Sequence, residues 1–150
     1  MKFLVVVLLG VAAILGGDAM QFTRGGLARE LLRQGFPRDQ LADWVCLVEA
    51  ESSRRTNIRG PTDHDGRTVW GLFQIKEGYW CTHGSPGGDC NMLYLMTNDI
   101  TAAADCAKEI YRQYNGFEAW EGWRNKCRYE LPDLTQYNLP RSTYPWRYYY

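Results

Sequence analysis

Glu51 is the residue whose position most directly suggests chemistry. Apolar side chains recur at helical spacing from Gln40 to Ser53, and a helix there places Glu51 only about 20° around the axis from Trp44. A carboxyl group desolvated beside an indole has a raised pKa and stays protonated closer to neutral pH. Such a group can donate a proton to a leaving oxygen, so Glu51 is a candidate general acid. The alternative is a helix-end glutamate that faces solvent.

The elements that position Glu51 are helices on either side of a small sheet. A second helix pattern covers Arg24 to Gln34, and a third begins after Asn98 or Asp99, either of which can cap it. Between them, a turn at Asp65-Gly66 and the β-type residues from Thr68 to Ile75 predict an antiparallel sheet. The predicted fold is α+β, a helical lobe plus a small β-lobe, with a ligand cleft between the lobes.

The C-terminal third contains many aromatic residues. Phe117, Trp120 and Trp123 are spaced to line one face of a shorter helix that reaches Cys127. Residues 134–150 form an aromatic-rich tail that can pack on its own domain, bind a partner or be a loosely ordered end.

Composition limits the kind of partner. Lys+Arg and Asp+Glu both number 17, so the formal charge is zero and nucleic acid is not an expected partner. The six Trp and ten Tyr residues offer flat apolar surfaces for a core or a sugar-binding cleft.

The N-terminus has the pattern of a signal peptide. Lys2 precedes an apolar run from Phe3 to Leu15, and the small residues before Met20 favour cleavage after Ala19. The run is too short to span a bilayer, which needs about 20 residues. We therefore expect residues 1–19 to be removed and the protein to be secreted. Secretion favours disulfides, and because the five cysteines are odd in number, at least one is left over or pairs with another chain.

Several motifs resemble the C-type lysozymes, especially those of insects, in the right order from about Phe22 to Asp133. They are Cys46-Leu-Val-Glu-Ala-Glu51-Ser-Ser, Gly60-Pro-Thr, Trp70-Gly-Leu-Phe-Gln74-Ile75, Tyr79-Trp80-Cys81, the run from Asn98 to Ile110, and the run from Ala119 to Cys127. The resemblance implies a lysozyme-like domain over residues 20–133, with a β-1,4-linked N-acetylated glycan as ligand and no cofactor or metal.

The resemblance also implies roles for single residues. Glu51 matches the general acid and Trp120 the indole wall beside it, consistent with the paired-carboxylate logic of glycosidases. The implied substrate-binding positions are Gln74, Ile75, Lys76, Tyr79, Trp80, Ala119 and Trp120.

Two positions near the implied sugar sites depart from the family pattern. Val69 stands where the family has its catalytic aspartate, and a valine can neither attack an anomeric carbon nor stabilise an oxocarbenium ion. Loss of such an electrostatic group removes roughly 10²–10³ in rate. Lys76 replaces a cleft asparagine and brings a cation to the sugar sites.

The cysteines depart as well. The resemblance implies bridges Cys46–Cys127 and Cys90–Cys106, whereas Gly25 replaces the first cysteine of the bridge that joins the family's termini. Cys81 then has no partner, so we expect a monomer with a free thiol or a Cys81-linked dimer.

Two acidic residues near Val69 are possible substitute carboxylates. With a three-residue turn at 64–66, Asp63 pairs with Arg67 and shares the sheet face of Val69; with a two-residue turn it points to the other face. Asp63 and Asp65 are also favoured turn residues with no further role required.

Three functions therefore stay open. The first is a glycan-binding protein with weak or lost muramidase activity. The second is an active lysozyme that pairs Glu51 with Asp63 or Asp65, and the third is an interaction protein that acts through its aromatic tail.

Overall fold

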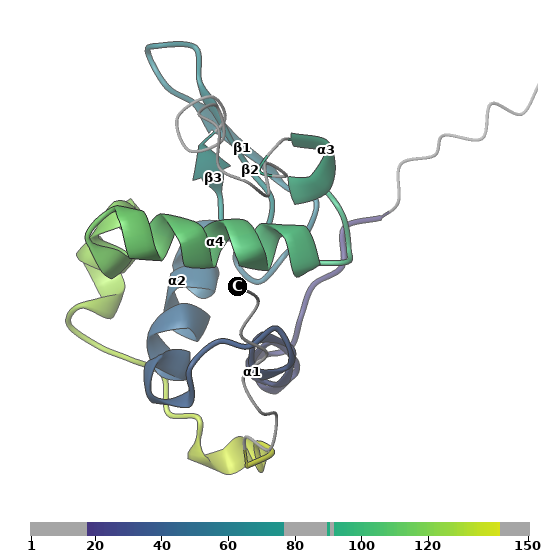
Figure 1. Ribbon diagram of the computed structural model, residues 1–150, viewed down its shortest axis with the longest axis vertical. Helices are drawn as coiled ribbons and strands as arrows, with labels where there is room; N and C mark the ends of the chain where they lie inside the picture. Colours follow the sequence, from purple (N-terminus) through teal and green to yellow (C-terminus); the bar gives the residue numbers. More distant parts are fainter. Residues whose placement is uncertain (1–17, 77–89, 91, 142–150) are drawn as a thin grey trace, which may run out of the picture.

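The structure, a computed structural model, describes residues 18–76, 90 and 92–141. Its elements in chain order are α1 (Arg24–Arg33), η1 (Arg38–Gln40), α2 (Leu41–Ser52), β1 (Arg59–Thr62), β2 (Thr68–Trp70), β3 (Ile75–Lys76), α3 (Met92–Leu95), α4 (Thr101–Gln113), η2 (Gly116–Ala119), η3 (Trp123–Cys127) and η4 (Thr135–Tyr137). The sheet lies at one end, α1 and α2 lie at the other, and α4 crosses between them (Figure 1). The predicted α+β fold is confirmed. No helix in the described ranges is long and apolar enough to cross a membrane.

Helices α1 and α2 lie where the apolar periodicity predicts them. The Thr23 hydroxyl accepts a hydrogen bond from the Gly26 amide and caps α1, and Gly35 leaves the helix with a φ of +83°. Ser53 ends α2 in the left-handed region, with a φ of 52°. The acid candidate Glu51 therefore lies in the last turn of a helix that contributes Leu41 and residues 44–48 to the core.

The three strands form an antiparallel sheet in the order β1-β2-β3. Thr62 pairs with Thr68, and the Asp63 amide donates to the Arg67 carbonyl at 2.8 Å. The turn is thus the three-residue one at 64–66, with Gly66 at a φ of +76°. This register, one of two that the sequence allowed, places Asp63 on the same face as Val69.

The β-type residues from Thr68 to Ile75 form two strands of the predicted antiparallel sheet, β2 and β3, separated by a tight turn. Gly71 begins the turn at a φ of +73°, and a Cβ there would lie 2.1 Å from the Leu95 carbonyl oxygen. The chain reverses because only glycine permits both that conformation and that approach.

Helix α4 begins after Asp99, whose Oδ1 accepts from the Thr101 amide at 3.0 Å and from the Thr101 hydroxyl at 2.6 Å. Asn98, the other candidate cap, binds Thr56 instead. The helix ends at Gln113 ahead of Asn115 and Gly116, which both have positive φ.

The predicted short helix through Phe117, Trp120 and Trp123 reaches Cys127 as expected, but it is not continuous and is wrong in passing through Trp120. The chain forms the 3₁₀ turn η2 and then the π-helical turn η3, and Trp120 between them is extended, with φ −106° and ψ 127°. The extended backbone turns the indole into the core, where its Nε1 donates to the Phe73 carbonyl at 2.9 Å. A tertiary hydrogen bond of this kind leaves no periodic signal in the sequence.

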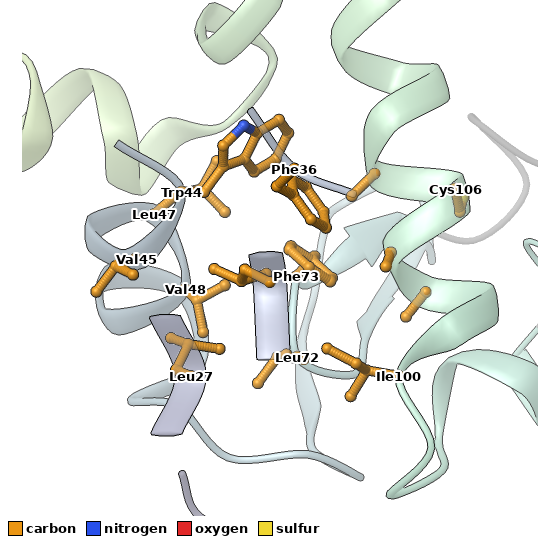
Figure 2. Close-up of a cluster of buried hydrophobic side chains, with 14 of the residues drawn as sticks. Leu27, Phe36, Trp44, Val45, Leu47, Val48, Leu72, Phe73, Ile100 and Cys106 are labelled. Carbon is orange, nitrogen blue, oxygen red and sulfur yellow. The ribbon is translucent and has the colours of Figure 1, made fainter. Parts of the chain in front are cut away.

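Aromatic rings around Trp44 form the centre of the core. Phe36, Phe117 and Trp120 each meet the Trp44 ring edge-on, at centroid distances of 4.7, 4.8 and 5.6 Å. Figure 2 shows Trp44 and Phe36 above Phe73, with Val48 and Leu72 completing the cluster. Two disulfides join segments of this core, Cys46–Cys127 and Cys90–Cys106, the two pairs that the resemblance implies.

The described part of the C-terminal tail, residues 134–141, packs on its own domain beside α1 (Figure 1). The ring of Tyr137 covers Gly25 so closely that a Cβ on Gly25 would lie 2.6 Å from its Cδ1. Arg29 donates to the Tyr137 carbonyl at 3.1 Å, and Arg38 donates to the Pro140 carbonyl at 2.6 Å. Of the three outcomes open for the tail, these residues follow the first; residues 142–150 lie outside the described chain.

Candidate functional site

Glu51 lies half-buried in the last turn of α2, where the helix meets the start of η3. Its Oε1 accepts a hydrogen bond from the Gly122 amide at 2.8 Å. Burial raises the pKa of the carboxyl, and the charge of Glu121 acts in the same direction; the Gly122 bond and Arg124 oppose the rise. The carboxyl is therefore disposed to remain protonated at a higher pH than an exposed glutamate, as a general acid requires.

The approach of η3 to α2 fixes the Glu51 carboxyl. A Cβ on Gly122 would lie 2.7 Å from Oε1 of Glu51 and 2.9 Å from the Cβ of Ala50, so a larger residue displaces one of the two segments. The Cys46–Cys127 bridge joins α2 to η3 with a Cα–Cα distance of 5.7 Å. Helix, disulfide and glycine together hold the carboxyl against one backbone amide.

Trp120 lies in the core next to this segment. It is 5% exposed and packs edge-on against Trp44. The residue stands two positions before Gly122, whose amide binds Glu51. Its own contacts make Trp120 a residue of the core.

The sheet side of the candidate site has a different composition. Val69 is paired across β2 and β3 with Lys76, whose Nζ lies 2.5 Å from Oδ2 of Asp63. The other Asp63 oxygen accepts from the backbone amides of Asp65 and Arg67 at 3.0 and 2.9 Å. Lys76, followed by these amides, lowers the pKa of Asp63 to about 2. The face that carries Val69 therefore holds an ionised carboxylate, but one engaged at both oxygens.

Gln74 contributes mainly to the internal structure of the sheet. It is buried with a φ of 48°, and its Nε2 donates to the carbonyls of Gly71 and Ile58 at 2.8 and 3.2 Å. A Cβ on Gly60 would lie 2.0 Å from Oε1 of Gln74 and 2.4 Å from Cγ2 of Val69. The Gln74 side chain is thus enclosed by backbone, with its amide hydrogens already used.

The remaining site candidates lie in the core, at the surface or outside the described residues. Ile75 is 1% exposed, so a ligand can meet its backbone but not its side chain; Ala119 is half-buried at the end of η2. Asp65 is exposed at the turn, and its Oδ1 lies 3.5 Å from Nε2 of His64. The stacking candidates Tyr79 and Trp80 and the odd thiol Cys81 lie outside the described residues.

The structure therefore separates the candidates into two groups. Glu51 and Trp120 gather where α2 meets η3, and Asp63, Val69 and Lys76 gather on the sheet. Sequence reasoning missed Gly122, which binds Glu51 through its backbone amide, and Arg124 and Glu121, which act on the pKa of Glu51. The sequence alone does not distinguish a glycine that lets two segments pack closely from any other glycine.

Comparison with known proteins identifies the family to which this α+β fold and its half-buried glutamate belong. The sequence model of the C-type lysozyme/alpha-lactalbumin family matches residues 20–139, and the chain belongs to this family. A lysozyme of Hyalophora cecropia is 48% identical over 134 residues, 87% of this chain and 96% of that protein. One of Galleria mellonella is 50% identical over 119 residues, 77% of this chain and 98% of its own length. Lysozyme P of Drosophila melanogaster is 40% identical over 139 residues, 88% and 95% of the two chains.

Proposed function

We propose that this chain is a secreted glycan-binding member of the C-type lysozyme family whose muramidase activity is weak or lost. Its ligand is a β-1,4-linked glycan of N-acetylglucosamine and N-acetylmuramic acid, as in peptidoglycan, or of N-acetylglucosamine alone, as in chitin. In this proposal residues 1–19 are the signal peptide, residues 20–133 bind the glycan, and Tyr79 and Trp80 stack on its sugar rings.

The observation that carries the proposal is the contrast between Glu51 and Val69. The acid side is complete, because Glu51 is half-buried with a raised pKa and a fixed hydrogen bond. At the position of the second carboxylate, Val69 has an aliphatic side chain, and its cross-strand partner is the cation Lys76. Protonation of the leaving oxygen is then supported, while the positive charge that develops on the sugar has no opposing carboxylate from residue 69.

A second candidate, an active glycosidase, is supported by the register of the hairpin. The three-residue turn brings Asp63 to the face of Val69, and its low pKa keeps it ionised. Against this, Lys76 and two backbone amides already bind both of its oxygens. Releasing Asp63 for catalysis requires breaking that ion pair, so we favour the binding function.

The test is peptidoglycan turnover and oligosaccharide binding measured on the same purified sample, with Glu51→Gln as the matched control. The proposal expects binding by both proteins, with turnover that is very slow in the wild type and absent in Glu51→Gln. Rapid wild-type turnover supports the second candidate instead. Absence of both binding and turnover removes the glycan proposal altogether.

A further inference from the structure

The segment Met20–Phe22 is docked on the domain as an extended strand. It runs antiparallel to residues 54–56, with the Thr56 amide donating to the Met20 carbonyl and the Phe22 amide to the Arg54 carbonyl, both at 2.9 Å. Gln21 and Arg55 form the bridge between these two bonds. The pairing thus starts at Met20, the residue that would become the N-terminus after cleavage behind Ala19.

The backbone nitrogen of Met20 faces two oxygen acceptors. The Thr56 hydroxyl lies 2.9 Å from it, and Oδ1 of Asn98 lies at 3.2 Å. The two acceptors also bind each other, because the Thr56 hydroxyl donates to Oδ1 of Asn98 at 2.5 Å. A peptide amide has only one hydrogen, so within the intact chain it must share that hydrogen between the two oxygens.

We propose that Thr56 and Asn98 form a binding site for a primary ammonium group, the free α-amino terminus that signal-peptide cleavage creates on Met20. The inference rests on the proposed secretion. It gives cleavage after Ala19 a structural consequence, because only that cleavage places the ammonium group on Met20. Processing converts a nitrogen with one hydrogen into a cation with three, and each acceptor then receives a hydrogen of its own.

The site has the properties that such a ligand needs. Thr56 is fully buried and is fixed by its own backbone bond to Met20, so its hydroxyl is held in place before the ammonium forms. Hydrogen bonds from a charged donor are stronger than those from a neutral amide. Because Asn98 precedes α4 while Thr56 follows α2, a bound terminus links the N-terminal strand to both regions.

The identity of residue 20 makes a direct experiment possible. Since it is methionine, translation can start there without any added residue, and oxidative refolding then gives a chain with its amine on Met20. The matched control starts at Ala19: it keeps the net charge but moves the amine by one residue and returns the Met20 nitrogen to an amide. A third chain starting at Asp18 restores the bond from Nδ2 of Asn98 to the Asp18 carbonyl, 3.1 Å in this structure.

The expected result is a folded-to-unfolded ratio about fivefold higher for the Met20 chain than for the Ala19 chain, measured by urea unfolding. Asn98→Ala, at an exposed position, should bring the Met20 and Ala19 chains toward equal stability, and so should Thr56→Val. The quantity compared is the difference in unfolding free energy between the Met20 and Ala19 chains that carry the same substitution. Any general destabilisation by that substitution then cancels.

Two results would overturn the inference: equal stability of the Met20 and Ala19 chains, or a difference that survives in both Asn98→Ala and Thr56→Val. A greater stability of the Asp18 chain than of the Met20 chain would also contradict it, because the uncut segment would then be the better ligand. The mass of the secreted protein tests the processing separately. A start other than Met20 rejects the proposed cleavage, whereas the stability comparison judges the site itself.

Discussion

The two sides of the candidate site differ in how firmly they are built into the fold. On the acid side, Trp120 is 5% exposed and hydrogen-bonded to Phe73, and the Cys46–Cys127 bridge joins the two segments that meet at Glu51. On the sheet side, Val69 and Lys76 are partly exposed and contact each other across two short strands.

This difference shows which parts of a catalytic site can be lost without cost to folding. Replacing Trp120 opens the core and leaves the buried Phe73 carbonyl without its donor, so stability alone is a reason to keep Trp120. A change at a half-buried sheet position has little effect on stability. An intact acid environment therefore does not by itself demonstrate catalysis in this protein.

The largest expected effect is on stability, from Trp120→Ala. Deleting a buried tryptophan should lower the free energy of unfolding by about 3–5 kcal/mol, measured by urea denaturation. Val69→Ala, the matched change on the sheet side, should cost only about 1 kcal/mol. Equal losses at the two positions would remove the contrast between the two sides.

The next effect is on turnover, from Val69→Asp. If the cleft is otherwise intact, the new carboxylate should raise the rate of peptidoglycan hydrolysis by up to about 10²–10³, equivalent to roughly 3–4 kcal/mol. Adding Glu51→Gln to this variant should abolish the gain, because the general acid is then missing.

Lys76 limits that gain, because it is the cross-strand neighbour of residue 69. A lysine beside the new aspartate competes with the sugar for its charge, so the double variant Val69→Asp with Lys76→Asn should be faster than Val69→Asp alone. An unchanged or slower double variant would show that Lys76 does not hinder the site.

A smaller effect is expected at Gly25 in α1, away from the two sides of the candidate site. Gly25→Ala forces a Cβ against the Tyr137 ring and should destabilise the protein by about 1–3 kcal/mol in urea unfolding. In a Tyr137→Ala background the same change should cost much less, since the ring is gone. A cost that does not depend on Tyr137 would mean that the tail does not pack there in solution.

The smallest effect is the pH dependence from Asp63. Its folded pKa of about 2 lies below the ordinary value of 3.8, so its contribution to stability is complete above about pH 4 and is lost as the pH falls toward 2. Asp63→Asn should remove this loss from the acid unfolding curve. Curves that coincide for wild type and variant would show that the ion pair with Lys76 does not form.

The sequence predicted those parts of the fold that depend on local periodicity. The helices α1, α2 and α4 have apolar residues at regular spacing, and the helical angle alone predicted that Glu51 lies on the partly buried face of α2. The short helix through Trp120 was predicted wrongly because a tertiary hydrogen bond to Phe73 overrides the local spacing.

The candidate site was predicted less completely. The sequence allows both a two-residue and a three-residue turn at Asp65-Gly66, and the two turns place Asp63 on opposite faces of the sheet. Only the observed strand register decides between these faces. The close contacts of Gly122 with Glu51 and of Gly25 with Tyr137 could not be predicted, because the residues that surround a glycine are distant from it in the sequence. Val69, in contrast, was recognised from the motif around it.

The central claim is that this protein has its acid but lacks a free second carboxylate. Its most direct test is the rate of peptidoglycan hydrolysis by wild type, Val69→Asp and Asp63→Asn in one assay. The account predicts a wild-type rate below that of Val69→Asp, by a factor of up to about 10²–10³, with no further loss in Asp63→Asn. A wild-type rate that Val69→Asp does not improve and that Asp63→Asn destroys would contradict it and would identify Asp63 as the second carboxylate.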